Sequence, residues 1–84
     1  MDARRTSNQS VEVSLSNAEA VVLHEALAYG EWSGEFADMS FVDPIFVEVL
    51  SRLQLALAPT ISELGSEGYG AAVNAALQQL RPAP

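Results

Sequence analysis

The side chains with the widest chemical range in this chain of 84 residues are its single histidine, His24, and the adjacent Glu25. A histidine followed by a glutamate begins the motif of zinc proteases, in which a second histidine four residues later is also a metal ligand. Position 28 is an alanine, and the chain has no other histidine and no cysteine. We therefore expect His24 to be a boundary residue held by a hydrogen bond. No catalytic residue, cofactor site or metal site is predicted.

A glycine-rich stretch at residues 65–70 precedes a predicted helix and superficially resembles a phosphate-binding loop. Such loops combine backbone N–H groups with a lysine. The chain has no lysine, and Glu67 would repel a phosphate. We interpret the stretch as a flexible turn that lets Tyr69 reach the core.

An acidic segment, EWSGEFADMSFVD at residues 31–43, contains the only tryptophan and two of the three phenylalanines. Its carboxylates are spaced by four, three and five residues, unlike the nearly alternate ligands of a calcium loop. Two interpretations stay open: a lid over the core, or a contact surface with aromatic anchors among carboxylates. We expect Phe36 and Phe41 to be buried and Trp32 to be partly exposed. The predicted partner-binding residues are Glu31, Trp32, Glu35, Asp38 and Asp43.

The distribution of charge favours a basic protein partner. The formal net charge is −7, and between Thr6 and Ser51 there are eight acidic residues and no lysine or arginine. Such a field repels phosphate backbones and attracts cationic surfaces, although an acidic surface also serves solubility. Nucleic acid is therefore not the expected partner.

The sequence also bears on the compartment. No apolar run approaches the ~18 residues of a membrane span. The first ten residues are polar and lack the apolar stretch of a secretion signal. We therefore expect no membrane contact and a cytoplasmic location.

Local patterns predict the elements that position these side chains. Residues 1–10 are expected to be a mobile tail ahead of a single helical domain, residues 11–84. Residues 11–16 alternate apolar and polar, which is typical of a half-buried strand. Ser16 and Glu19 then match a capping box, and the helix over 17–29 would end at Gly30.

Two more helices are predicted after the acidic segment. Asp43 and Pro44 mark the start of a helix that runs to residue 58, and another spans 69–80. The predicted core stripe of the first comprises Phe46, Val49, Leu50, Leu53 and Leu57. The fold class is therefore mainly α, a short N-terminal strand followed by three helices in a small bundle.

The predicted strand needs a partner, because a lone strand leaves its backbone groups unsatisfied. That partner is a second strand of this chain or a copy of the same strand across a two-fold axis. The second choice is more economical, and the first helix is apolar on two sides. We therefore predict a homodimer. Its predicted interface residues are Val11, Val13, Leu15, Val22 and Tyr29.

The stretch VEVSLSNAEAVVLHEALAYG, residues 11–30, resembles the opening of the ribbon-helix-helix regulators. That resemblance implies a dimeric DNA-binding regulator whose paired strands enter the major groove. In this chain thirteen residues, 31–43, separate the glycine from the next predicted helix. Its base-reading side would begin with Glu12, and Arg4 and Arg5 would be the nearby phosphate ligands.

From residue 11 onward the chain is also similar to small acidic helical bacterial proteins of uncharacterised function. The shared features are residues 19–23, the stripe over 46–57, and a last helix led by Tyr69. Together, the sequence favours a non-enzymatic protein-interaction module, such as an immunity- or antitoxin-like inhibitor or a small accessory subunit. The alternative is the ribbon-helix-helix-like DNA-binding regulator.

Overall fold

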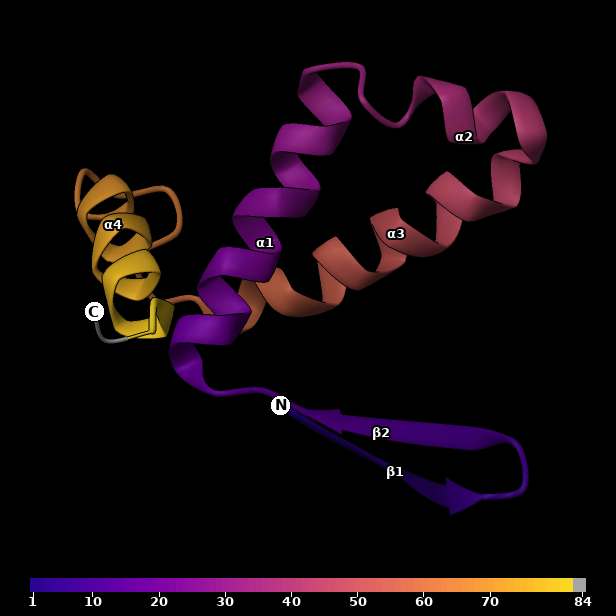
Figure 1. The fold of residues 1–84 in the computed structure, drawn as a ribbon, viewed down its shortest axis with the longest axis horizontal. Helices are drawn as coiled ribbons and strands as arrows, with labels where there is room; N and C mark the ends of the chain where they lie inside the picture. Colours follow the sequence, from indigo (N-terminus) through magenta and orange to yellow (C-terminus); the bar gives the residue numbers. More distant parts are fainter. Residues whose placement is uncertain (83–84) are drawn as a thin grey trace.

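The computed structural model describes residues 1–82, which form a two-stranded hairpin followed by helices (Figure 1). The described part of the chain is mainly helical, as predicted, but it has four α-helices where the sequence predicted three. The additional helix arises because part of the acidic segment is helical. The elements are β1 (Asp2–Ser7), β2 (Ser10–Ser14), α1 (Asn17–Trp32), α2 (Ala37–Val42), α3 (Pro44–Leu57), a 3-10 turn (Ala58–Thr60) and α4 (Tyr69–Leu80).

The predicted strand is β2, and its partner lies in the same chain. β1 runs antiparallel to β2, with Ala3 opposite Val13 and Arg5 opposite Val11. The expected tail is therefore a strand, and the preferred pairing with a second copy is not the one that the structure shows. Every residue of both strands is exposed, and the hairpin extends away from the helices (Figure 1).

α1 begins as the sequence predicted. The Ser16 hydroxyl accepts a hydrogen bond from the Glu19 N–H at 3.1 Å, and the Glu19 carboxylate accepts one from the Ser16 N–H at 2.9 Å. The backbone bond to Ser16 is also the main reason that the pKa of Glu19 is lowered. This capping box satisfies two N–H groups that the first turn would otherwise leave free.

The end of α1 differs from the prediction. The helix continues past Gly30 to Trp32, and the left-handed backbone conformation occurs at Gly34, with φ of 82°. Gly30 is buried, because the ring of Phe36 lies where a Cβ atom would be. Gly30 therefore serves close packing of the acidic segment on α1 rather than helix termination.

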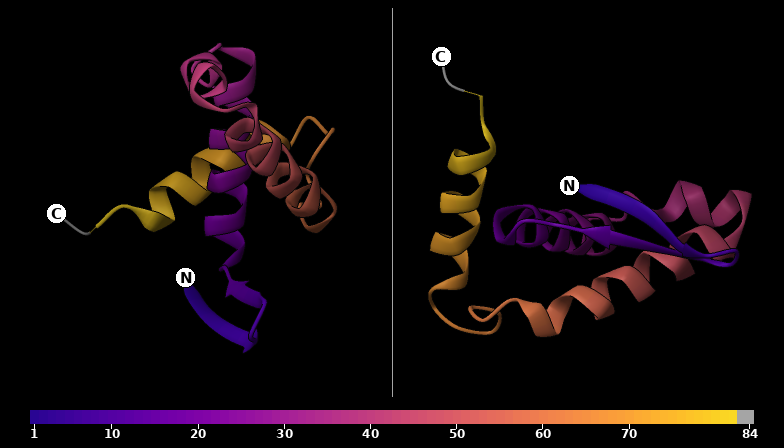
Figure 2. Two further views of the ribbon diagram at one scale, coloured as in Figure 1. Left: turned by 90° about the vertical axis from the view of Figure 1, so that its right-hand side faces the viewer. Right: turned by 90° about the horizontal axis from the view of Figure 1, so that it is seen from below.

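The core is small and lies where α4 crosses α1 (Figure 2). Ala18 and Val21 of α1 pack with Ala76 of α4 and with Ile61, which follows the 3-10 turn. Small side chains on both helices allow this close approach. The connection between α3 and α4 thus contributes directly to the core through Ile61.

α3 has a well-defined start, but most of its side chains are not covered by the rest of the chain. The Asp43 side chain accepts a hydrogen bond from the Ile45 N–H at 3.0 Å, which confirms the predicted N-cap. Of the predicted core stripe, only Leu57 is buried, and Phe46, Val49 and Leu53 are exposed. The prediction that these three residues belong to the core of the chain is therefore wrong. Within residues 1–82, no helix combines the length and apolar character needed to span a bilayer.

Candidate interaction surfaces

The aromatic residues at the end of α1 lie at the surface. Trp32 is 73% exposed, and the ring of Tyr29 meets it edge-on, with the centroids 5.1 Å apart. Phe36 and Phe41 were both expected to be buried, but Phe36 is only half-buried against Gly30 and Phe41 is 88% exposed. Trp32 therefore does not act as a lid over the core of this chain.

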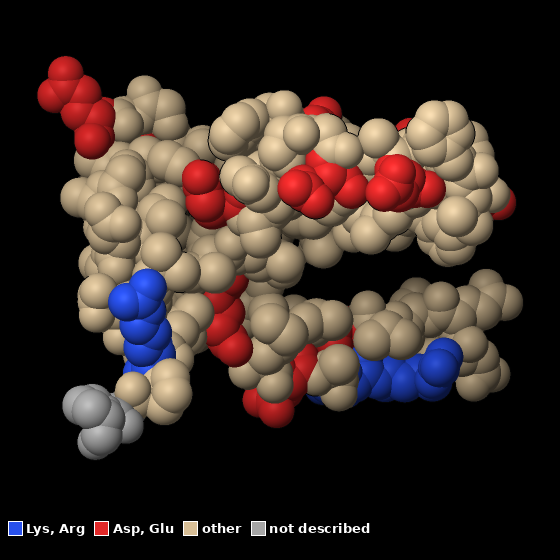
Figure 3. Space-filling model, turned by 45° about the horizontal axis from the view of Figure 1, so that its top comes forward, with Lys and Arg blue, Asp and Glu red and all other residues tan. Residues whose placement is uncertain are grey.

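The carboxylates predicted to bind a partner have different surroundings. Glu31, Glu35 and Asp38 are exposed, and none of the ion pairs formed within residues 1–82 includes them. Asp43 instead caps α3, which gives this side chain a structural role. Figure 3 shows acidic side chains in a row along one arm of the molecule, with the basic side chains elsewhere.

His24 belongs to a hydrogen-bonded triplet between α1 and α4. Its ring is 5% exposed, and Nδ1 lies 3.1 Å from the Tyr69 hydroxyl, which in turn donates to a Glu25 oxygen at 2.7 Å. Because the hydroxyl proton points to Glu25, the His24 Nδ1–H is the donor to Tyr69 in this arrangement. The hydrogen bond predicted for His24 is confirmed, but the residue is buried and does not lie at the boundary of the core.

The triplet fixes Tyr69 rather than activating it. Burial, followed by the hydrogen bond to Glu25, raises the pKa of Tyr69 to about 12. A phenol with this pKa stays protonated at neutral pH, so it does not act as a base there. No group of three or more His, Asp or Glu side chains in residues 1–82 is arranged to hold a metal ion. We read the triplet as the attachment of α4 to α1.

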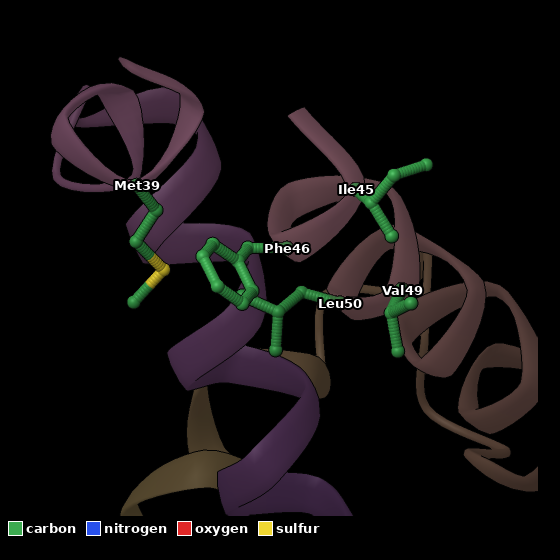
Figure 4. Close-up of a pocket in the computed structure, with 5 residues that line it drawn as sticks. All are labelled: Met39, Ile45, Phe46, Val49 and Leu50. Atoms are coloured by element: carbon green, nitrogen blue, oxygen red, sulfur yellow. The ribbon is translucent and has the colours of Figure 1, made fainter. Parts of the chain in front are cut away.

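An open apolar hollow of about 540 Å³ lies between α2 and α3. In Figure 4 the Met39 side chain from α2 lies next to Phe46 of α3, with Leu50 beside Phe46 and with Ile45 and Val49 farther from Met39. All five lining residues are apolar: Met39, Ile45, Phe46, Val49 and Leu50. The sequence had placed Phe46, Val49 and Leu50 in the predicted core, and neither Met39 nor Ile45 was among the predicted binding residues. The one signal for a surface was the unbroken stripe of large apolar residues on α3.

The predicted dimer interface is not one continuous patch. Val13 and Leu15 line a hollow of about 420 Å³ that Leu57 also borders, and Val11 is exposed on β2. Val22 and Tyr29 line a different hollow of about 300 Å³ between α1 and α4. The structure therefore divides these five residues between two surfaces.

No protein-family model, no curated protein and no solved structure matches this chain. The function is therefore argued from the geometry of these surfaces.

Proposed function

We propose that the chain is a non-enzymatic protein-interaction module that binds a basic protein partner. The binding site is the acidic aromatic surface, which we define as Tyr29, Glu31, Trp32, Glu35 and Asp38. An immunity- or antitoxin-like inhibitor and a small accessory subunit both fit such a module. The observation that carries the proposal is the exposed Trp32, held edge-on by Tyr29 in a stretch without lysine or arginine.

The chemistry of this surface supports a protein ligand. Tryptophan and tyrosine are the residues most enriched at the energetic centres of protein interfaces. The contact with Tyr29 already restricts the Trp32 ring, so less side-chain freedom is lost on binding. Glu31, Glu35 and Asp38 can therefore steer a cationic surface toward the ring without first giving up an ion pair.

The proposal is tested by affinity capture from the native host with three forms of the chain: wild type, Trp32→Ala and Leu55→Ala. Leu55 is the matched control because it is also 73% exposed but lies on α3, outside the surface. We expect a basic protein that wild type and Leu55→Ala retain and Trp32→Ala loses. The purified pair should then lose about 2 kcal/mol of binding free energy in Trp32→Ala. Glu35→Gln with Asp38→Asn should mainly slow association.

Two outcomes would contradict the proposal. One is a captured protein that Trp32→Ala retains as well as wild type does. The other is saturable binding of duplex DNA at physiological salt that is lost when Arg4 and Arg5 are replaced, because phosphate contacts of that kind define the regulator alternative. Arg4 is already paired with Glu12 at 3.0 Å.

A further inference from the structure

A mostly exposed apolar surface of the described chain lies on α2 and α3. We call it the α2–α3 face and define it as Met39, Ile45, Phe46, Val49, Leu50 and Leu53. Its members come from the apolar hollow and from the adjoining turn of α3. An apolar stripe along one side of a helix is the pattern of a helix packed against another element. Val47 and Leu50 line a small hollow with Phe36 and with Glu31 of α1, so the half-buried Leu50 lies at the covered edge of this face.

The chain exposes more surface than a compact monomer of its mass, and part of the excess lies on the exposed hairpin. Its accessible surface is 6303 Å², whereas a compact monomer of 9.0 kDa exposes about 4,850 Å². The difference, roughly 1,450 Å², exceeds the ~800 Å² that each partner buries in a standard protein interface. The radius of gyration, 14.5 Å, is likewise above the ~12 Å of a compact domain of this length.

Charge indicates which molecule covers the face. The only charged residues in Pro44–Leu57 are Glu48 and Arg52, and these pair with each other at 3.2 Å. α3 is therefore neutral in a chain whose net charge is −7. A basic partner would gain no net attraction from α3, whereas two acidic copies can approach along α3 without adding a net repulsion there.

The spacing on α3 suits contact between identical helices. Ile45, Val49 and Leu53 are four residues apart and form one ridge of the helix. The ridge is symmetric about Val49, so an antiparallel copy would place its Leu53 opposite Ile45 and its Val49 opposite Val49. Such reciprocal contacts are what a two-fold interface requires.

We propose that the chain forms a homodimer in which the α3 helices of two copies pack antiparallel about a two-fold axis near Val49. This packing buries the α2–α3 face. The proposal does not depend on the binding role of the acidic aromatic surface, which shares no residue with the α2–α3 face and would be present twice in the dimer.

The test uses sedimentation equilibrium of the full chain at micromolar concentration. Wild type should sediment with twice the 9.0 kDa mass of the chain. Val49→Glu places two like charges across the axis and should weaken the dimer at least tenfold. Leu55→Glu is the control, because Leu55 lies on the opposite side of α3 from Phe46 at 3.6 residues per turn, and it should leave the mass unchanged.

A crosslink tests the geometry separately from folding. The chain has no cysteine, so Val49→Cys introduces a single thiol, which should oxidise to a covalent dimer. Leu55→Cys should remain uncrosslinked under the same conditions. Three outcomes would overturn the proposal. The wild-type chain sediments only as the 9.0 kDa monomer, Val49→Glu does not weaken the dimer, or the two cysteine variants crosslink equally.

Discussion

The α1–α4 pair and the α2–α3 pair use apolar residues differently. In the first, small side chains such as Ala18 and Ala76 meet around Val21, and Tyr69 is hydrogen-bonded to α1. In the second, the larger Phe46 and Val49 stay exposed. The first pair is stabilised by contacts within the chain. The second carries the stronger apolar stripe and lacks a cover in residues 1–82, so we infer that its stability depends on assembly.

The largest expected effect is a loss of stability when Ile61 of the α1–α4 core is shortened. Ile61→Ala should lower the free energy of unfolding by about 3 kcal/mol, because it opens a cavity in the α1–α4 core. Since this core lies within one chain, the loss should be the same at every protein concentration. Urea unfolding at several concentrations measures it, with Leu55→Ala as the exposed control. A loss that grows on dilution would mean that Ile61 also belongs to an interface between chains.

An intermediate effect is expected at Tyr69. Tyr69→Phe should cost about 1.5 kcal/mol at neutral pH, because it removes a hydrogen bond to the Glu25 carboxylate. The variant should also change the response to alkali. The pKa of Tyr69 is raised from 10.0 to about 12 in the folded chain, so the protonated phenol stabilises the fold. This contribution is complete below pH 10 and is lost as the pH rises toward 12.

Urea unfolding between pH 10 and pH 12 measures this loss of stability. Wild type and the control Tyr29→Phe should both lose stability, and Tyr69→Phe should lose less. Equal losses in wild type and Tyr69→Phe would show that the tyrosine does not tie α4 to α1 in solution.

The smallest effect on stability is expected at Trp32. Because the ring is exposed and touches Tyr29 edge-on, Trp32→Ala should change the free energy of unfolding by less than about 1 kcal/mol. Thermal or urea unfolding of the purified variant measures this change in the free energy of unfolding. A loss of about 3 kcal/mol would instead indicate a ring packed in a core and would remove the basis for a binding role.

The parts of the fold that depend on adjacent residues could be predicted from the sequence. Ser16 with Glu19 and Asp43 with Pro44 mark helix starts because capping needs only neighbouring groups. The end of α1 could not be predicted this way. Gly30 has the residue type of a helix terminator, but packing of Phe36 on it keeps it helical.

Two further parts of the fold also depend on contacts that adjacent residues do not reveal. β1 was not predicted, because residues 1–10 are polar and carry no alternation, and their extended form follows from pairing with β2. The stripe on α3 correctly indicates a helix, but a periodic pattern does not tell which molecule covers it. For the acidic aromatic surface, the sequence indicated an exposed Trp32 but not the support from Tyr29 or the exposure of Phe41.

Hydrogen exchange at two protein concentrations, roughly a hundredfold apart, tests the contrast between the helix pairs most directly. Amides of α1 and α4 should show equal protection at both concentrations, because contacts within the chain hold them. Amides of α3 should be protected at the high concentration and exchange faster at the low one. Equal protection of α3 at both concentrations, in a sample that sediments as a monomer, would contradict the claim that a second copy covers the α2–α3 face.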